Sequence, residues 1–213
     1  FHTGGIMAGL SQTMPEVIEE AMLSAKRHGV IVSYDLNYRP SLWENSGGLA
    51  KAREVNSRLA ESADVLLGFG VGADIDIEGT NELFDPGFMD PSTVKNTILK
   101  AIEKFPDIKM FATTIRNVRT AGFNDLGGIF WVDGQFYESP LKRELQVLDR
   151  IGSGDSFAAG IIYGFLTHKD PQTALDFGVA HGALALTTPG DQSMANLDEV
   201  EKMIHQGGSS IIR

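Results

Sequence analysis

Short apolar segments alternate with amphipathic segments along most of this 213-residue chain. Apolar residues that recur every three or four positions predict helices, and short continuous apolar runs predict buried strands. The expected helices lie over about 13–28, 49–61 and 92–104, and the expected strands lie over about 30–34, 64–67 and 110–114. Because strands that alternate with helices typically form a parallel sheet, the pattern predicts an α/β fold with three layers, αβα, and a mostly parallel central sheet.

Local signals sharpen this prediction at several element ends. Thr13 and Glu16 have the spacing of a capping box, and Gly29 is expected to end the first helix. The segment 127–137 alternates in polarity about an Asp-Gly turn at 133–134, which predicts a β-hairpin. The last third is mainly helical, with helices expected over about 155–166, 171–186 and 196–205.

The composition limits the class of protein without naming a function. With 42% hydrophobic and 22% charged residues, the chain can bury a full core, and no Pro-, Ser- or charge-rich run marks a linker. We therefore expect residues 1–213 to form part of a single domain. The net charge of −10 disfavours nonspecific binding to nucleic acid or to an anionic membrane surface. Any phosphate-binding site must then depend on positive groups close to the phosphate, because the net charge of the chain does not attract it.

The residue inventory excludes two further kinds of site. The chain has no cysteine, which rules out disulfides and thiolate metal sites, and no apolar run approaches membrane-spanning length. Its five histidines are scattered, and no pair has metal-ligand spacing on a shared helical face. The chain starts at Phe1 without a charged and apolar leader, so we expect a cytoplasmic location.

The segment Asp149–Gly160 reads as a strand end, a glycine turn, a carboxylate and a helix start in succession. Gly152 and Gly154 let backbone N–H groups approach a ligand, and the following helix aims its unpaired amides at the same place. Asp155 is well sited there to take a proton from a hydroxyl that attacks a phosphoryl group. On these residues alone, an ordinary Asp N-cap after a tight turn is an equally good interpretation.

A second polar group follows the strand expected at 30–34. Asp35, Asn37 and Arg39 come after its carboxyl end, where open α/β sheets place their ligands. Alternate residues of an extended segment share a face, so Asn37 and Arg39 are expected to project together, and the planar fork of Arg39 suits a carboxylate. The competing interpretation is that Asp35 caps a turn and Arg39 forms a surface ion pair.

These two segments resemble the motifs of one enzyme family. Residues 149–160 resemble the D-x-x-G-[AGS]-G-D signature of the ribokinase-like, or phosphofructokinase-B, family of sugar kinases. Residues 33–43 resemble the D-x-N-x-R-x-x-L-W motif of its 2-keto-3-deoxygluconate kinase branch. The motifs lie in the family's order and at about its spacing, and the likeness extends over nearly the whole chain. It implies the ribokinase-like fold.

The resemblance also implies a function, namely ATP-dependent phosphorylation of a sugar-acid hydroxyl, with 2-keto-3-deoxygluconate as the expected substrate and ATP and Mg²⁺ as cofactors. It implies Asp155 as the catalytic base. The other implied site residues are Gly152, Ser153 and Gly154 in the anion hole, Asn37, Arg39 and Asp191 at the substrate, and Thr114, Arg116, Gly152, Gly154 and His181 at the nucleotide.

For two of the implied nucleotide contacts, a second interpretation stays open. Related kinases often have T-x-G-x-x-G where this chain has Arg116 in place of a glycine, so Arg116 either reaches a phosphate or is simply solvated. The small-residue helix around His181 either borders an adenine pocket or packs closely against a neighbouring helix.

The chain departs from the family after the strand at 64–67, where relatives carry an N-x-x-E motif that helps to organise magnesium. This chain has neither the Asn nor the Glu, and its metal ligands stay unknown. Asp74 or Asp76 takes over that role, or both belong to a solvated acidic turn. A noncatalytic ligand-binding protein that keeps the kinase fold is therefore the alternative function.

Two further expectations concern the chain as a whole. In the family, well over a hundred residues precede the point that matches Phe1, so we expect a C-terminal portion that lacks the N-terminal part and the lid. A homo-oligomer is left open. A Rossmann-type dehydrogenase fragment is discounted, because G-x-G-x-x-G is missing after a first strand and Asp155 would repel a pyrophosphate.

Overall fold

The computed structural model describes residues 1–69, 90–168 and 170–205. The helices span Gly5–Ala8 (α1), Met14–Arg27 (α2), Pro40–Trp43 (α3), Gly48–Ala60 (α4), Pro91–Lys104 (α5), Ser153–His168 (α6), Pro171–Leu186 (α7) and Leu197–His205 (α8). The strands span His2–Gly4 (β1), Ser33–Asp35 (β2), Val65–Leu67 (β3), Met110–Thr120 (β4), Phe123–Val132 (β5), Gln135–Glu138 (β6) and Lys142–Gln146 (β7). These elements fall into two compact units, within 1–85 plus 92–111 and within 86–91 plus 112–213.

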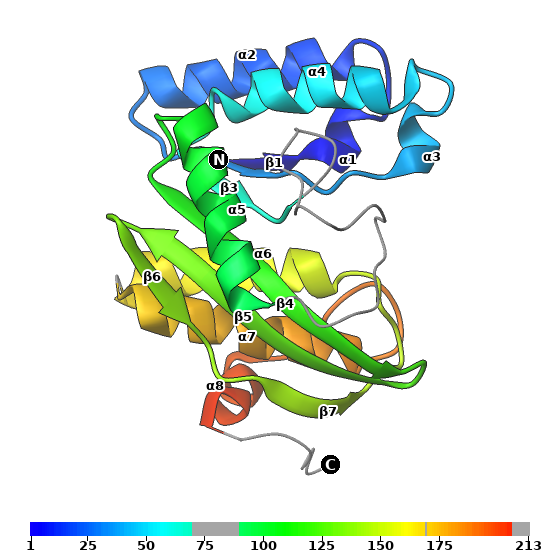
Figure 1. Cartoon of the computed structure of the whole chain (residues 1–213), viewed down its shortest axis with the longest axis vertical. Coiled ribbons are helices and arrows are strands. Elements are labelled where there is room, and N and C mark those ends of the chain that lie inside the picture. Colours follow the sequence, from blue (N-terminus) through cyan, green and yellow to red (C-terminus); the bar gives the residue numbers. More distant parts are fainter. Residues whose placement is uncertain (70–89, 169, 206–213) are drawn as a thin grey trace. The chain divides into compact units, whose positions relative to one another are not determined.

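The first unit contains three short parallel strands with helices α2 and α4 running side by side (Figure 1). Gly4 lies opposite Asp35, and Asp35 lies opposite Leu67. The start of β4 is next to β3. The carboxyl ends of the strands therefore meet at Asp35, which places the residues after it at the end of the sheet where α/β proteins bind ligands.

Helix α2 shows where the predicted boundaries hold and where a predicted cap fails. It buries Ile18 and Met22, one helical turn apart, and Gly29 follows it with a φ of +71°, as expected for a helix end. Thr13 is the N-cap residue, but its side chain makes no capping hydrogen bond. The predicted capping box is wrong, because Thr13 has helical backbone angles and its hydroxyl bonds to Ser11 Oγ at 3.3 Å.

A buried polar pair fixes α4 to the sheet of the first unit. The hydroxyl of Tyr34 on β2 donates to Asn56 Oδ1 on α4, and Asn56 Nδ2 donates to Ala52 O at 2.9 Å. Both side chains are fully buried. Burial and the neighbouring Asp35 raise the pKa of Tyr34, so its hydroxyl stays protonated and remains a donor.

The second unit is built on antiparallel pairings, in contrast to the first. β5 pairs with β6 and with β7, and Asp133 and Gly134 join β5 to β6 with positive φ angles of 51° and 78°. The predicted hairpin is therefore confirmed. The sheet is therefore mixed. The parallel pairing expected from the sequence holds within the first unit, whereas β5 pairs antiparallel with β6 and β7.

Strand β4 runs six residues beyond the expected end at 114, and β7 is not predicted by the sequence pattern. Polar residues interrupt the apolar pattern in the second half of β4 and in β7, so no strand is predicted there. Several of these residues bind a buried carboxylate. Asp125 is fully buried on β5 and accepts from Arg119 Nε at 2.8 Å, Asn117 Nδ2 at 3.2 Å and the Glu144 backbone N–H at 2.8 Å. This network joins β4, β5 and β7.

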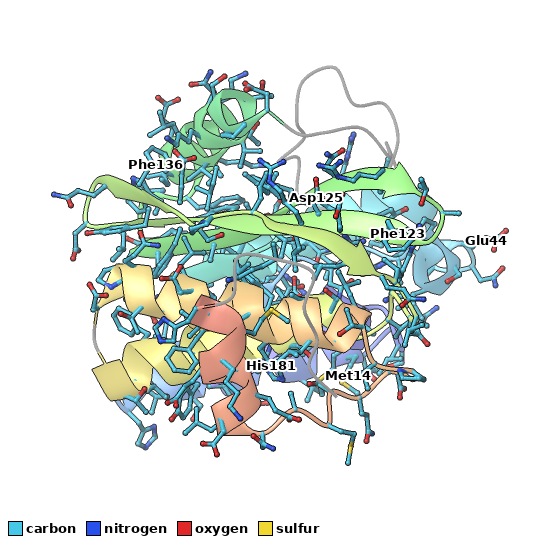
Figure 2. The ribbon with its side chains drawn as sticks, turned by 90° about the horizontal axis from the view of Figure 1, so that it is seen from below. Met14, Glu44, Phe123, Asp125, Phe136 and His181 are labelled. Atoms are coloured by element: carbon cyan, nitrogen blue, oxygen red, sulfur yellow. The ribbon has the colours of Figure 1, made fainter. Side chains whose placement is uncertain are left out.

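Helices α6 and α7 cover one face of the strands of the second unit (Figure 2), and glycines let them approach each other closely. A Cβ atom at Gly160 would lie 2.5 Å from Phe177 O, and one at Gly164 would lie 2.6 Å from the Cα of Ala174. Beside His181 on α7, a Cβ atom at Gly182 would lie 3.1 Å from Ser153 O on α6, so this small residue also serves close helix packing, one of the two interpretations offered for the segment. None of the described helices is long and apolar enough to cross a membrane.

Candidate active site

The glycine turn of the second unit is held by the end of helix α7. The backbone N–H groups of Leu148 and Asp149 both donate to Leu186 O, at 2.9 and 3.4 Å. Asp149 Oδ1 then accepts from the Ile151 N–H at 2.9 Å, which closes a small turn. Gly152 follows with a φ of +80°, a left-handed conformation that favours glycine. The turn leads directly into helix α6.

Asp155 lies in the first turn of α6, not at its N-cap position, because the helix begins at Ser153. Its side chain is exposed, and within the part of the chain that the structure describes its carboxylate forms no hydrogen bond or ion pair. The N-cap interpretation of Asp155 is therefore not the one that this geometry supports. An ionised carboxylate without a partner can accept a proton from an incoming hydroxyl.

The backbone amides at the start of α6, in the same turn as Asp155, form an open cradle. The first helical hydrogen bond runs from the Ser156 N–H to Gly152 O at 2.8 Å, so the N–H groups before Ser156 have no intrahelical partner. No atom lies within 4 Å of the position that a Cβ would take on Gly154. Unpaired amides and the positive end of the helix dipole suit an anion such as a phosphate.

The side chain of Ser153 faces inward, away from such a ligand. Ser153 is fully buried, and its Oγ donates to Gly182 O on α7 at 3.0 Å. Only its backbone N–H is then available to an anion. Gly152 packs against the backbone carbonyl of Asp191, which leaves no room for a Cβ. The turn is therefore held from two sides, by α7 and by the segment that contains Asp191.

His181 links the same two parts of the second unit. It lies on α7, among the helices below the strands in Figure 2, and its Nε2 is 2.9 Å from Ser193 Oγ. Burial lowers the pKa of His181, and a hydrogen bond with the Ser156 backbone partly offsets this effect. The neutral imidazole is favoured at neutral pH. His181 thus contacts both the first turn of α6 and the segment that carries Asp191.

Thr114 and Arg116 lie on strand β4 of the second unit and are partly exposed. Arg116 is not simply solvated, because its Nε is buried and has no hydrogen-bond partner in the described part of the chain. Burial lowers the pKa of Arg116, and the nearby cation Arg150 lowers it further. Arg150 is a residue to which the sequence interpretation gives no role, although it lies inside the glycine-turn motif.

In the first unit, Asp35 and the residues after it form the turn that one interpretation predicts. The backbone N–H of Asn37 donates to Asp35 Oδ1 at 3.3 Å. Gly4 and Gly68 leave space for Asp35, since a Cβ on Gly4 would lie 2.8 Å from Asp35 O and one on Gly68 would lie 3.2 Å from Asp35 Oδ1. Asp35 therefore caps the turn, as the competing interpretation of this segment predicts.

Arg39 stands at the N-cap position of α3 with an extended backbone and is exposed. Its guanidinium makes no ion pair or hydrogen bond among the described residues, so the surface ion pair stays a prediction. Asn37 is partly buried two positions earlier. Within residues 1–69, 90–168 and 170–205, no partner engages the Arg39 side chain, and the carboxylate-binding interpretation also stays a prediction.

Asp74 and Asp76 lie outside the described residues. Among the described residues, no group of three or more histidine or acidic side chains could hold a metal ion. Mg²⁺ in phosphoryl-transfer sites usually keeps several waters and binds through one or two carboxylates together with the substrate phosphates. The exposed carboxylate of Asp155 beside an anion cradle is compatible with an ion of that kind.

Comparison with known proteins identifies relatives of this chain. Residues 127–198 match the family described as pfkB family carbohydrate kinase. The chain is 32% identical over 213 residues to a 2-dehydro-3-deoxygalactonokinase of Haloferax volcanii, covering 100% of the chain and 59% of the relative. It is 28% identical over 205 residues to a 5-dehydro-2-deoxygluconokinase of Lacticaseibacillus casei, covering 93% of the chain and 54% of the relative.

A solved structure agrees with these sequence matches. The 2-dehydro-3-deoxygluconokinase of Thermotoga maritima superimposes with a TM-score of 0.83 and 30% identity, over 97% of this chain and 59% of that one. The chain thus spans a little over half the length of the relatives that it matches. The predicted ribokinase-like α/β fold and the resemblance predicted from the two motifs are confirmed by these matches.

Proposed function

We propose that this chain carries the phosphoryl-transfer part of an ATP-dependent sugar-acid kinase. The observation that carries the proposal is the exposed carboxylate of Asp155 on the first turn of α6, which has no partner among the described residues and lies beside the amide cradle that begins at Gly152. A base next to an anion hole is the arrangement that phosphoryl transfer to an alcohol requires. The kinase relatives support the reaction class.

In the proposed reaction, Asp155 accepts the proton of a primary hydroxyl of the sugar acid. The hydroxyl oxygen forms a bond to the γ-phosphorus of ATP, and the bond from that phosphorus to the bridging oxygen breaks, so ADP leaves with the electron pair. The backbone N–H groups of Gly152, Ser153 and Gly154 stabilise the charge on the phosphoryl oxygens. When bound with the nucleotide, Mg²⁺ neutralises phosphate charge.

The substrate that we propose is 2-keto-3-deoxygluconate, with the 6-phosphate as product. Arg39, with two parallel hydrogen bonds to the carboxylate, and Asn37 are assigned to the acid end of the substrate. Asp191 is assigned to the sugar. Relatives act, by their names, on 2-dehydro-3-deoxygalactonate, 2-dehydro-3-deoxygluconate and 5-dehydro-2-deoxygluconate. All three are acidic keto-deoxy sugars, so the shared carboxylate suits one common arginine.

For the nucleotide, we propose contacts with Thr114, Arg116 and the cradle. His181 is assigned to the same site, and its hydrogen bonds with Ser193 and the Ser156 backbone make its contribution one of holding the first turn of α6 in place. We further propose that residues 1–213 form the C-terminal part of a single ribokinase-like domain of a cytoplasmic enzyme.

The test is a direct measurement of phosphoryl transfer, made on this chain and on its full reading frame. The protein is incubated with ATP, a divalent ion and 2-keto-3-deoxygluconate, and the sugar phosphate is followed by phosphorus NMR. The same assay with the galacto isomer and with 5-dehydro-2-deoxygluconate ranks the substrates. ATP binding is measured separately by calorimetry. Transfer is expected from the full reading frame, and ATP binding without transfer to any of the three acids would contradict the proposal.

A further inference from the structure

Arg116 is an anomaly in the second unit. Its Nε is buried and donates to no acceptor among the residues that the structure describes, although a guanidinium nitrogen shielded from water normally has one. No ion pair engages the side chain among the described residues. The same strand provides a comparison, because Arg119 is paired with the buried carboxylate of Asp125 at 2.8 Å. The fold can therefore supply a carboxylate to an arginine on β4, and among the described residues it supplies none to Arg116.

A second cation, Arg150, lies close enough to Arg116 to repel its charge. Burial lowers the pKa of Arg116, and Arg150 lowers it further. Arg150 is exposed, and among the described residues its side chain makes a single long hydrogen bond, of 3.5 Å from Nη2 to Ala121 O. Two guanidinium groups that approach without a carboxylate between them repel each other, so the arrangement is unfavourable until an anion joins them.

The pattern of contacts places Arg116 on the helix-covered face of the strands. Leu126 packs against Ala183 and Leu186 of α7, so the adjacent Asp125 faces the opposite side. Asn117 and Arg119 reach Asp125 and share that opposite side. Because side chains alternate along a strand, Arg116 lies on the face covered by α6 and α7.

Arg150 belongs to the glycine turn, and its Nη2 contacts Ala121 O between β4 and β5. It stands two residues before Gly152, in the turn that leads into the helix. The guanidinium groups of Arg116 and Arg150 and the amide cradle thus bring positive charge together in one unit of a chain whose net charge is −10.

We propose that Arg116 and Arg150 form a two-guanidinium site for a polyphosphate chain, and that this anion supplies the acceptors that Arg116 lacks. The inference rests on the proposed nucleotide site and deepens it. Two planar forks match the several adjacent oxygens of linked phosphates, whereas a sugar carboxylate offers two oxygens and a single charge. The polyphosphate comes from a nucleotide or from inorganic polyphosphate, which share this chemistry.

The experiment uses the 213-residue chain with inorganic tripolyphosphate as the first probe. Calorimetry measures its affinity for the unchanged chain and for Arg116→Met, Arg116→Lys, Arg150→Gln and Arg143→Gln. Arg143 is an exposed arginine on β7, so its variant is a control that removes the same charge. We expect Arg116→Met and Arg150→Gln each to weaken binding about tenfold, Arg116→Lys to weaken it less, and Arg143→Gln to leave it unchanged.

Thermal unfolding separates a ligand-binding arginine from a structural one. Without an anion, Arg116→Met is expected to raise the melting temperature, because it removes a buried, unpartnered charge and keeps the apolar stem. Tripolyphosphate should raise the melting temperature of the unchanged chain and have little effect on Arg116→Met. A lower melting temperature for Arg116→Met, together with unchanged tripolyphosphate affinity, would show a structural role and overturn the proposal.

ADP and adenosine identify the source of the phosphate and separate this proposal from the proposed function. If the site binds a nucleotide, Arg116→Met lowers the affinity for ADP and leaves the affinity for adenosine unchanged. If inorganic polyphosphate is the natural ligand, tripolyphosphate binds more tightly than ADP and the two-arginine site still stands. Equal weakening of ADP and adenosine would overturn it. A protein that binds these anions through both arginines but transfers no phosphate would contradict the proposed function alone.

Discussion

Ser153 Oγ donates a hydrogen bond of 3.0 Å to the carbonyl oxygen of Gly182, and this bond ties the first turn of α6 to the middle of α7. Both groups are buried. The bond fixes the orientation of the turn that carries Asp155, since Ser153 is the first residue of the helix. The position of the proposed base is therefore set by a neighbouring helix as well as by its own turn.

Gly182→Ala is expected to disturb this contact. A Cβ at Gly182 would lie 3.1 Å from Ser153 O and 3.4 Å from Phe157 Cβ, so the first turn of α6 has to shift. Overpacking of this kind typically lowers the free energy of unfolding by about 1–3 kcal/mol. Denaturant unfolding of the chain measures the change, and tripolyphosphate affinity should fall with it.

The control for this substitution is Gly122→Ala. No atom lies within 4 Å of the position that a Cβ would take there, and the residue does not have a positive φ. Its free energy of unfolding should stay within about 0.5 kcal/mol of the unchanged chain. If both variants unfold alike, the Ser153–Gly182 contact does not constrain the turn.

Asp155→Asn is expected to lower the rate of phosphoryl transfer by about 10²-fold or more, because an amide cannot accept the proton of the attacking hydroxyl. ATP affinity should change little, since the cradle is made of backbone groups. Steady-state kinetics on the full reading frame and calorimetry with ATP give the two quantities.

A matched control for the base is Asp198→Asn. Asp198 is also an exposed aspartate in the first turn of a helix, α8, so the substitution has the same chemistry at a helix start. It should leave both turnover and ATP affinity unchanged. Turnover that survives Asp155→Asn would remove Asp155 from the mechanism.

Much of the fold can be predicted from the sequence where apolar periodicity is regular. Helix α7 has the predicted bounds, 171–186, because Pro171 marks its start and its apolar face is nearly continuous. Strand β7 is not predicted, because its residues Lys142–Gln146 are mostly polar. It is held by tertiary contacts, such as the bond from the Glu144 N–H to Asp125, that no local pattern reveals.

In the candidate site, too, some features can be predicted from a local motif and others depend on tertiary contacts. The glycine turn and Asp155 follow from a short motif, because their chemistry is local to a turn and a helix start. The inward direction of Ser153 and the hydrogen bond of His181 with Ser193 depend on residues 12 to 29 positions away. The unpartnered Nε of Arg116 is likewise a property of packing, so the sequence alone leaves its role between a phosphate contact and a solvated side chain.

Arg39→Lys is expected to raise KM for an acidic sugar by about tenfold, because a point charge cannot replace two parallel hydrogen bonds to a carboxylate. KM for a neutral sugar of the same length should change much less. Initial-rate kinetics with both sugars measure the difference. Arg27→Lys, at an exposed position on α2, is the matched control and should affect neither sugar. Equal increases for both sugars after Arg39→Lys would argue against a carboxylate at this residue.

Asp64 makes the stability of the first unit depend on acid pH. Its carboxylate accepts from the Val32 N–H and from Lys109 Nζ, both at 2.9 Å, and its side chain is 9% exposed. Burial alone would raise the pKa of Asp64, but these hydrogen bonds and the nearby Lys26 outweigh it and lower the pKa below the usual 3.8.

A carboxyl group whose pKa is lower in the folded state stabilises the fold above its unfolded pKa, and the contribution disappears as pH falls through the folded value. We therefore expect Asp64→Asn to lower the free energy of unfolding by about 1–3 kcal/mol at pH 7. The difference from the unchanged chain should shrink below about pH 4. Asp125, whose pKa is lowered as well, keeps part of the acid sensitivity in the variant. Urea unfolding at a series of pH values gives both curves, and parallel curves from pH 7 to pH 2 would show that the Asp64 carboxylate contributes no pH-dependent stability.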